Sequence, residues 1–147
     1  MAYVMSPLEV EVIVKLVMSA VLGGIIGLER EYNRSAAGIK TYAIVCMGSA
    51  LFTVASLYTD IRVAAGVITG IGFLGAATIF KTDATDGKGR MRVSGITTAS
   101  LIWSVSAMGF VIGVGMYLAA VVATVLLLVI LIPVEYAEKR LLKTHRE

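Results

Sequence analysis

Val93–Val134 reads VSGITTASLIWSVSAMGFVIGVGMYLAAVVATVLLLVILIPV, 42 consecutive residues without a charged side chain. As one α-helix this stretch would measure about 63 Å, twice the hydrocarbon thickness of a bilayer. It must therefore turn back once, and the three glycines within Gly109–Gly115 mark the turn. The stretch predicts two transmembrane helices, over about 94–110 and 115–136.

Three further apolar segments precede this stretch, at Val10–Leu28, Thr41–Thr59 and Val63–Phe80. Each has close to the ~20 apolar residues that a helix needs to cross a membrane. The composition agrees, because 58% of the residues are hydrophobic and 16% are charged, against about 25% charged in a soluble domain. We predict an all-α integral membrane protein, a single transmembrane domain over residues 1–147 with five helices at about 7–29, 41–59, 62–80, 94–110 and 115–136.

The first helix has a recognisable start and carries one pair of charges. Ser6, Pro7 and Glu9 have the spacing of an N-cap, a first helical residue and a capping box. Glu11 and Lys15 are one turn apart, and their place near the helix end lets both side chains reach water. The segment lacks the features of a cleaved signal peptide, so we expect this helix to stay in the protein.

Basic residues gather on one side of the five helices. Eleven of the 13 Lys and Arg residues fall in segments 29–40, 81–92 and 135–147, and Lys15 and Arg62 fall on the other side. Because basic loops are retained in the cytoplasm, we predict an outer amino terminus and a cytoplasmic carboxyl terminus. The basic loops then face the headgroups of the lipid bilayer, and the net charge of +3 requires no nucleic-acid partner. Interfacial anchors are expected from tyrosines near the helix ends, Tyr42, Tyr58, Tyr117 and Tyr136.

Residues for metal or thiol chemistry are scarce in this sequence. Cys46 is the single cysteine and His145 the single histidine, so the sequence has no His/Cys metal cluster and no internal disulfide. We find no nucleophile or general base in a catalytic motif. We therefore expect no enzymatic activity and no cofactor.

A weak internal repeat has an offset of 57 residues. The pattern Gly-Ile-x-Thr occurs at Gly38–Thr41 and again at Gly95–Thr98, and Ser49-Ala50 matches Ser106-Ala107. One interpretation is two parallel helical hairpins followed by a fifth helix, which is a known plan of membrane proteins. The other is that glycine and threonine recur at helix starts for capping reasons alone.

Glycines are dense in the first and third apolar segments. Gly70–Gly75, GIGFLG, matches the G-x-G-x-x-G pattern of dinucleotide-binding loops, but it lies inside an uncharged span whose backbone must be helical. Close helix packing explains the pattern better, since glycines four residues apart let two backbones approach. A third interpretation is that the glycines let the helix break and line a cavity. The packing candidates are Gly23, Gly27, Gly66, Gly70, Gly72 and Gly75, with a further pair at Gly109 and Gly113.

Two pairs of charges mark candidate functional sites at helix ends. One interpretation of Glu29 and Arg30 is a solvated end of the first helix, where Arg30 is favourable. The other is a buried ion pair or a cytoplasmic gate, because Glu29 meets the unfavourable end of the helix dipole and needs a partner. Asp60 either caps the third helix or holds a negative charge beside Arg62, available to a hydrated cation at the outer mouth. No metal ligands can be assigned. The functional candidates are these four residues with Thr41 and Thr98.

Four blocks of the sequence stand in the order of a known family. They are Gly24-x-x-Gly27-x-Glu29-Arg30, Ala37-Gly38-Ile39-x-Thr41, Asp60-x-Arg62-x-Ala64-Ala65-x-Val67 continuing into Gly70–Ala76, and Gly95–Ala99 with Trp103. Together they resemble the MgtC/SapB family of bacterial and archaeal membrane proteins over about residues 20–120. The resemblance implies a plasma-membrane protein linked to growth under magnesium limitation, to survival of some pathogens inside host cells, and to regulation of membrane complexes such as the proton-translocating ATP synthase.

The chain departs from the family pattern at two places. Larger members carry a soluble cytoplasmic domain after the last helix, whereas this chain ends at Glu147. Members also tend to have proline after the aspartate of the third block, where this chain has Ile61.

Two functional hypotheses follow. The first is a non-enzymatic regulator that forms a homo-oligomer through its glycine faces and acts on another membrane protein complex. The alternative is a transporter or channel for Mg²⁺ or another cation, with Asp60 and Glu29 at its two ends. No span carries an ionisable residue at its centre, which disfavours an ion path, although hydrated Mg²⁺ needs only one or two carboxylates.

Overall fold

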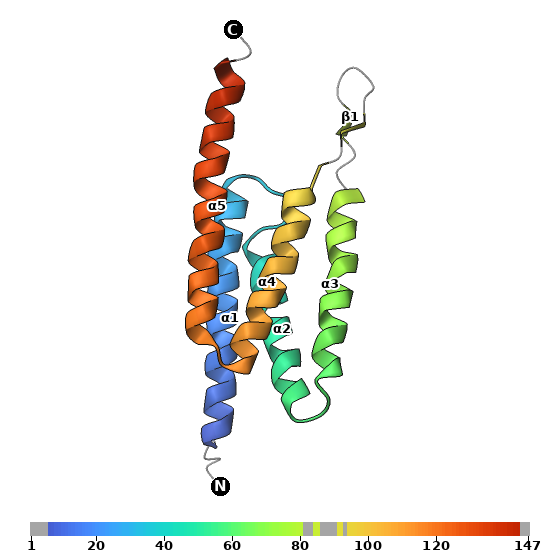
Figure 1. The fold of residues 1–147 in the computed structure, drawn as a ribbon, viewed down its shortest axis with the longest axis vertical. Helices are drawn as coiled ribbons and strands as arrows, with labels where there is room; N and C mark the ends of the chain where they lie inside the picture. Colours follow the sequence, from blue (N-terminus) through green and yellow to red (C-terminus); the bar gives the residue numbers. More distant parts are fainter. Residues whose placement is uncertain (1–5, 81–83, 86–90, 93, 145–147) are drawn as a thin grey trace.

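The computed structural model describes residues 6–80, 84–85, 91–92 and 94–144 of the chain. This part of the chain forms five α-helices and one antiparallel pair of two-residue strands (Figure 1). Each helix begins within two residues of its expected start. In chain order the elements are α1 (Pro7–Tyr32), α2 (Ile39–Leu57), α3 (Arg62–Phe80), β1 (Ala84–Thr85), β2 (Met91–Arg92), α4 (Ile96–Val114) and α5 (Tyr117–Thr144).

The helices have the length and composition of membrane spans. Within the described ranges, α1, α2, α3 and α4 are each long and apolar enough to cross a membrane. The apolar part of α5 is shorter, Tyr117–Pro133, and the helix continues through Pro133 to Thr144. The fold is therefore that of an all-helical, multi-pass membrane protein, as predicted.

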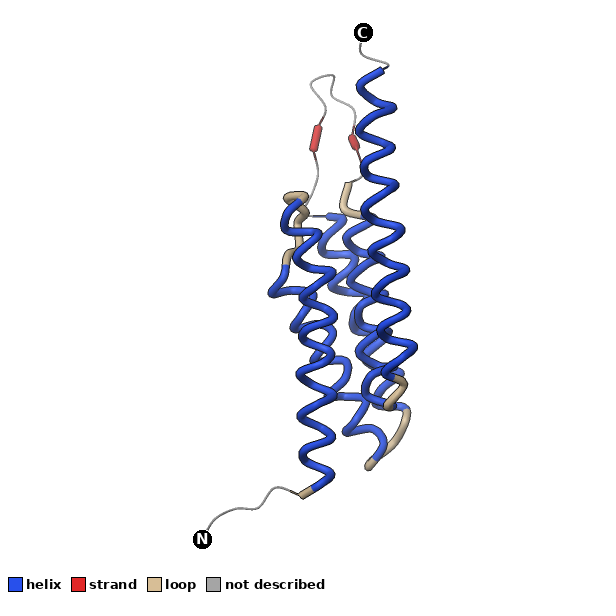
Figure 2. The backbone as a smooth tube through the Cα atoms, turned by 90° about the vertical axis from the view of Figure 1, so that its left-hand side faces the viewer, coloured by secondary structure: helices blue, strands red, loops and turns tan. Residues whose placement is uncertain are grey.

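The five helices stand side by side along one direction (Figures 1 and 2). The end of α1, the start of α2, the two strands, the start of α4 and the end of α5 lie at the same end of the bundle. We call this the basic end, because it carries segments 30–40 and 139–143 with their Lys and Arg residues. The start of α1 and the turns that join α2 to α3 and α4 to α5 lie at the opposite end.

The start of α1 follows the sequence signal. Ser6 is the N-cap residue, Pro7 opens the helix, and the Glu9 backbone N–H donates to Ser6 Oγ at 3.3 Å. Glu9 Oε2 in turn accepts from the Ser6 backbone N–H at 2.6 Å. This is the capping box that the spacing predicts.

The turn between α4 and α5 differs from the prediction. Helix α4 does not end near residue 110 but runs through Gly109 and Gly113 to Val114. The chain leaves the helix at Gly115, whose φ of 99° lies in the left-handed region that favours glycine. Gly109 and Gly113 pack against another helix, so the chain turns at Gly115, the remaining glycine of this stretch.

The internal repeat has a structural counterpart in α2 and α4. Both helices are 19 residues long, run from the basic end to the opposite end, and pack side by side (Figure 1). Ser49 Oγ of α2 donates to the Ser106 carbonyl of α4 at 2.7 Å, and these serines are 57 positions apart. Helix α1 packs against α2 and α4, and α3 packs against α4 and α2. The two hairpins α1–α2 and α3–α4 thus surround a shared α2–α4 contact, and α5 packs against α4 and α1.

Glycines bring α1 into backbone contact with α2. A Cβ added at Gly23 would lie 2.6 Å from the Tyr42 carbonyl oxygen, and one at Gly27 would lie 2.6 Å from Ile39 Cα. Such distances leave no room for any side chain at either glycine. Both predicted packing residues therefore lie where two helix backbones meet.

Glycines of α4 make the same kind of contact with the other side of α2. A Cβ at Gly109 would overlap the Cys46 carbonyl oxygen, and one at Gly113 would lie 2.5 Å from Thr53 Cβ. Helices α1 and α4 therefore both touch the α2 backbone, each from its own side.

Two side chains expected near water or at the interface lie inside the bundle. The Lys15 side chain is 8% exposed, and it lies on the same stripe of α1 as the buried Ser19 and Gly23. Its ion-pair partner Glu11 lies 2.8 Å away, and the Glu11 side chain is 55% exposed. Tyr42 is fully buried, so its prediction as an interfacial anchor is wrong. Both positions are near helix ends in sequence, but neighbouring helices cover them.

Candidate functional site

A buried polar cluster lies at the basic end, where α1 meets α2. The Glu29 side chain is 9% exposed and that of Arg30 is 12% exposed, and Glu29 Oε2 lies 3.6 Å from Arg30 Nε. Glu29 Oε1 accepts a hydrogen bond from Asn33 Nδ2 at 2.7 Å. The buried ion pair predicted from the sequence is therefore present, because a carboxylate at this helix end needs a cation and a donor.

Tyr42 brings α2 into the same cluster. Its ring lies in the core, and its backbone carbonyl lies against Gly23 of α1, two turns before Glu29. Within the described residues, Glu29 Oε2 and the Tyr42 hydroxyl are buried without a hydrogen-bond partner. Since buried polar atoms are nearly always satisfied, these two atoms make the cluster the candidate functional site.

Glu31 ties the end of α1 to the start of α2. Its Oε2 accepts from the Ile39 backbone N–H at 3.0 Å, so a carboxylate caps the positive end of α2. A Cβ at Gly38 would lie 2.5 Å from that same oxygen, so a side chain there would displace the Glu31 carboxylate. Between them Arg34 adopts a left-handed φ of 54°, which closes the connection.

Three residues of this cluster were missed by the sequence reasoning, Glu31, Asn33 and Tyr42. The spacing of Glu29 and Asn33, four residues apart on one helix, is a signal that could have been used. Tyr42 and Glu31 act through contacts between separate elements, for which local spacing gives no sign.

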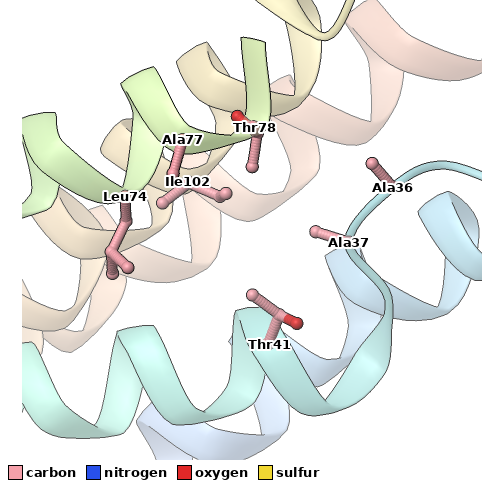
Figure 3. Close-up of a pocket in the computed structure, with 7 residues that line it drawn as sticks. All are labelled: Ala36, Ala37, Thr41, Leu74, Ala77, Thr78 and Ile102. Carbon is pink, nitrogen blue, oxygen red and sulfur yellow. The ribbon is translucent and has the colours of Figure 1, made fainter. Parts of the chain in front are cut away.

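A cavity of about 250 Å³ also opens at the basic end of the bundle. Figure 3 shows Thr41 of α2 and Thr78 of α3 on facing walls, with the connection between α1 and α2 along one side. Its other lining residues are apolar: Ala36, Ala37, Leu74, Ala77 and Ile102. The Thr78 hydroxyl donates to the Gly75 carbonyl of its own helix at 2.7 Å, so the pocket is largely apolar.

Thr98, the repeat counterpart of Thr41, has a different role. It is buried, and its Oγ1 lies 2.9 Å from Ser35 Oγ in a hydrogen bond between α4 and the α1–α2 connection. The two predicted threonines thus lie at the same end of the bundle, one lining the cavity and one fixing a loop.

Asp60 and Arg62 lie at the opposite end, far along the bundle from Glu29 (Figure 1). Asp60 Oδ1 accepts from the Arg62 backbone N–H at 2.9 Å, which caps the start of α3. The ion pairs of the described residues are Glu11–Lys15 and Glu29–Arg30, and none joins Asp60 to the Arg62 side chain. The capping role is therefore observed.

The third-segment glycines differ from those of α1. A Cβ at Gly75 would lie 3.6 Å from Ala99 Cβ, an ordinary contact between α3 and α4. Cβ atoms at Gly66, Gly70 and Gly72 would meet nothing within 4 Å, so these three glycines pack against no other helix of the chain.

A metal-holding group of three or more His, Cys, Asp or Glu residues is also absent from the described ranges.

Comparison with known proteins places the chain in a family. The sequence model of the MgtC family matches residues 16–140. The chain is similar to YhiD of Escherichia coli strain K12, named as a proposed magnesium transporter, with 37% identity over 134 residues that cover 82% of this chain and 59% of YhiD. It is 37% identical to the protein SrpB of Synechococcus elongatus over 122 residues, 75% of this chain and 67% of SrpB.

The MgtC protein of Salmonella typhimurium strain 14028s is 35% identical over 120 residues, which cover 79% of this chain and 49% of that protein. The chain thus spans about half the length of several of these relatives. No solved structure matches the chain. The match to the family model covers most of the sequence, including the polar cluster of α1, and on this ground the protein belongs to the MgtC family.

Proposed function

We propose that this protein is a non-enzymatic regulator in the plasma membrane, which acts on another membrane protein during adaptation to low magnesium. Family membership supports the link to magnesium, and the excess of Lys and Arg at the basic end supports a cytoplasmic position for that end. The buried cluster of Glu29, Arg30 and Tyr42 would then face the cytoplasm and be the part that carries regulation.

The observation that carries this proposal is the closed interior of the bundle. Helices α1, α2 and α4 touch at glycines, and interior hydroxyls are bonded to helix carbonyls: Ser19 Oγ donates to Leu16 O at 2.9 Å and Thr53 Oγ1 to Ser49 O at 2.8 Å. Lys15, on the same stripe of α1, is buried and is paired with Glu11 at 2.8 Å. A cation path through one chain would need a hydrated or acidic route, and these contacts oppose it.

Cation transport is the second candidate, and two observations favour it. YhiD is named as a proposed magnesium transporter. The Glu29 carboxylate, nine-tenths buried, is an oxygen ligand of the kind that hard cations prefer, and the cavity lined by Thr41 and Thr78 lies at the same end of the bundle. A route would then have to run outside the α1–α2–α4 interior.

The experiment compares growth and magnesium uptake in a host from which the protein is deleted. We expect the wild-type chain to restore growth at low magnesium without changing the initial rate of Mg²⁺ uptake by the cells. Glu29→Gln, which keeps the shape of the side chain and removes its charge, should reach the membrane at the normal level and fail to restore growth. Uptake that increases with the amount of protein, or growth that does not depend on the protein, would contradict the proposal.

A further inference from the structure

The cavity of about 250 Å³ at the basic end lies between α2 and α3 and reaches from the surface of the bundle to its core (Figure 3). Ile102 of α4, which lines it, is 1% exposed, whereas Leu74 of α3 is 44% exposed. Thr41 of α2 and Ala77 of α3 are exposed as well. Because Leu74 and Ala77 belong to the spanning part of α3, the cavity opens sideways toward the bilayer.

The size of the cavity suits a single hydrocarbon chain. One turn of an α-helix, 5.4 Å long and at least about 10 Å wide with its side chains, fills roughly 400 Å³, so a helix of another protein could not enter between α2 and α3. An acyl chain is only one methylene wide. The lining side chains other than Thr41 and Thr78 are apolar, as the wall around such a chain should be. Lipid is therefore the occupant that the size, the lining and the position in the bilayer favour.

Hydrogen-bond donors without a partner gather on the α2 side of this cavity. Thr78 Oγ1 donates to the Gly75 carbonyl of its own helix, but Thr41 Oγ1 forms no hydrogen bond with a described residue. The backbone N–H groups of Lys40 and Thr41, at the positive end of α2, also donate to no described residue. These donors suit the ester and phosphate oxygens of a glycerophospholipid, which follow directly on its acyl chains.

Positive charge lies at the same end of the cavity. Arg34 belongs to the connection along one side of it, Lys40 directly precedes Thr41 in α2, and both side chains are exposed. Neither forms an ion pair with a described residue. The two acids at the end of α1 are engaged, Glu29 in the buried ion pair and Glu31 with the α2 backbone. The charges of Arg34 and Lys40 therefore complement an anionic headgroup, which basic pockets between membrane helices are known to attract.

We propose that an anionic glycerophospholipid binds in this cavity. One acyl chain fills the apolar space between α2 and α3, and the Thr41 hydroxyl donates to an ester oxygen of the lipid. The phosphate lies beside Arg34 and Lys40, which attract it by charge. This site does not depend on whether the protein regulates another membrane protein or carries Mg²⁺.

The test titrates the purified full chain with phosphatidylglycerol and with phosphatidylcholine of the same acyl chains, and native mass spectrometry measures the bound lipid. We expect wild type to bind phosphatidylglycerol at least about tenfold more tightly. Ala77→Leu fills part of the cavity and should weaken phosphatidylglycerol binding at least about tenfold. Ala65→Leu, at an exposed position of α3 that does not line the cavity, should bind like wild type. Equal affinity of wild type for the two lipids, or equal effects of the two substitutions, would overturn the proposal.

A second pair of variants tests the headgroup contact and leaves the helix packing unchanged. Arg34→Gln combined with Lys40→Gln should bind both lipids with the weaker affinity of phosphatidylcholine, because only the attraction by charge is lost. Arg62→Gln, which removes an exposed basic side chain at the opposite end, should keep the preference of wild type. Inorganic phosphate in excess should not displace the lipid, because it cannot fill the apolar cavity. A preference that survives the loss of both charges, or displacement by phosphate, would also overturn the proposal.

Discussion

At the residue scale, the burial of single charged and aromatic side chains was the hardest property to derive from the sequence. The unfavourable place of Glu29 on the helix dipole indicated a partner, and the structure provides Arg30 and Asn33. Lys15 and Tyr42 were expected in water or at the interface because they lie near helix ends in sequence. Both are covered by other helices, and no local pattern reveals which neighbour a helix face will meet.

The first prediction concerns Glu29. Glu29→Ala leaves Arg30 without its acid in a buried cluster and should lower the free energy of unfolding by about 3–5 kcal/mol. Glu29→Gln keeps an acceptor for Asn33 and should lose less, about 1–3 kcal/mol. Thermal unfolding of the purified variants in detergent measures both. Equal stability of Glu29→Ala and wild type would show that the Glu29–Arg30 pair does not stabilise this end of α1.

The second prediction concerns Asp60 at the opposite end. Asparagine accepts the Arg62 backbone N–H about as well as aspartate, so Asp60→Asn should unfold at the wild-type temperature. Asp60→Ala removes the cap and should cost about 0.5–2 kcal/mol. If Asp60→Asn is as unstable as Asp60→Ala, then the charge and not the cap stabilises this turn.

At the element scale, helix existence was predictable and glycine function was not. Long uncharged runs can only be helices in a bilayer, so the five helices follow from run length. The same glycine pattern, however, has three outcomes in this chain: close packing at Gly23 and Gly109, a left-handed turn at Gly115, and no contact within the chain at Gly66. Which outcome applies depends on the neighbouring helix, and the expected turn was misplaced for that reason.

The third prediction uses the neighbouring glycines of α1. A Cβ at Gly23 would lie 2.6 Å from the Tyr42 carbonyl oxygen, so Gly23→Ala should cost about 1–3 kcal/mol by overpacking. At Gly24 the nearest atom is 3.9 Å from such a Cβ, so Gly24→Ala should gain up to about 1 kcal/mol of helix propensity. Unfolding in detergent compares the two, and a stabilised Gly23→Ala would mean that the α1–α2 backbones are further apart than described.

At the scale of the whole molecule, the repeat organises the bundle. An offset of 57 residues was visible in the sequence, but its weak matches left capping as an equal explanation. The contact between Ser49 and Ser106, equivalent residues of α2 and α4, favours paired hairpins. The asymmetry introduced by α5 could not be predicted, because nothing in the apolar sequence of α5 indicates which helix it covers.

The fourth prediction concerns orientation. Thr59 lies in the turn after α2 and Lys40 lies at the start of α2, at opposite ends of the bundle, and both are exposed. With the basic end in the cytoplasm, Thr59→Cys should react with a membrane-impermeant thiol reagent in intact cells, and Lys40→Cys should react only after the membrane is opened. Labelling of both in intact cells would rule out the assigned orientation.

The uptake of Mg²⁺ into liposomes that contain the purified full chain shows whether the bundle is closed to cations. A Mg²⁺-sensitive dye inside the liposomes reports entry, and protein-free liposomes give the baseline. Because the α1 and α4 backbones both touch that of α2, we predict uptake equal to the baseline at every protein content. Uptake that increases with protein content and saturates with Mg²⁺ concentration would contradict the account.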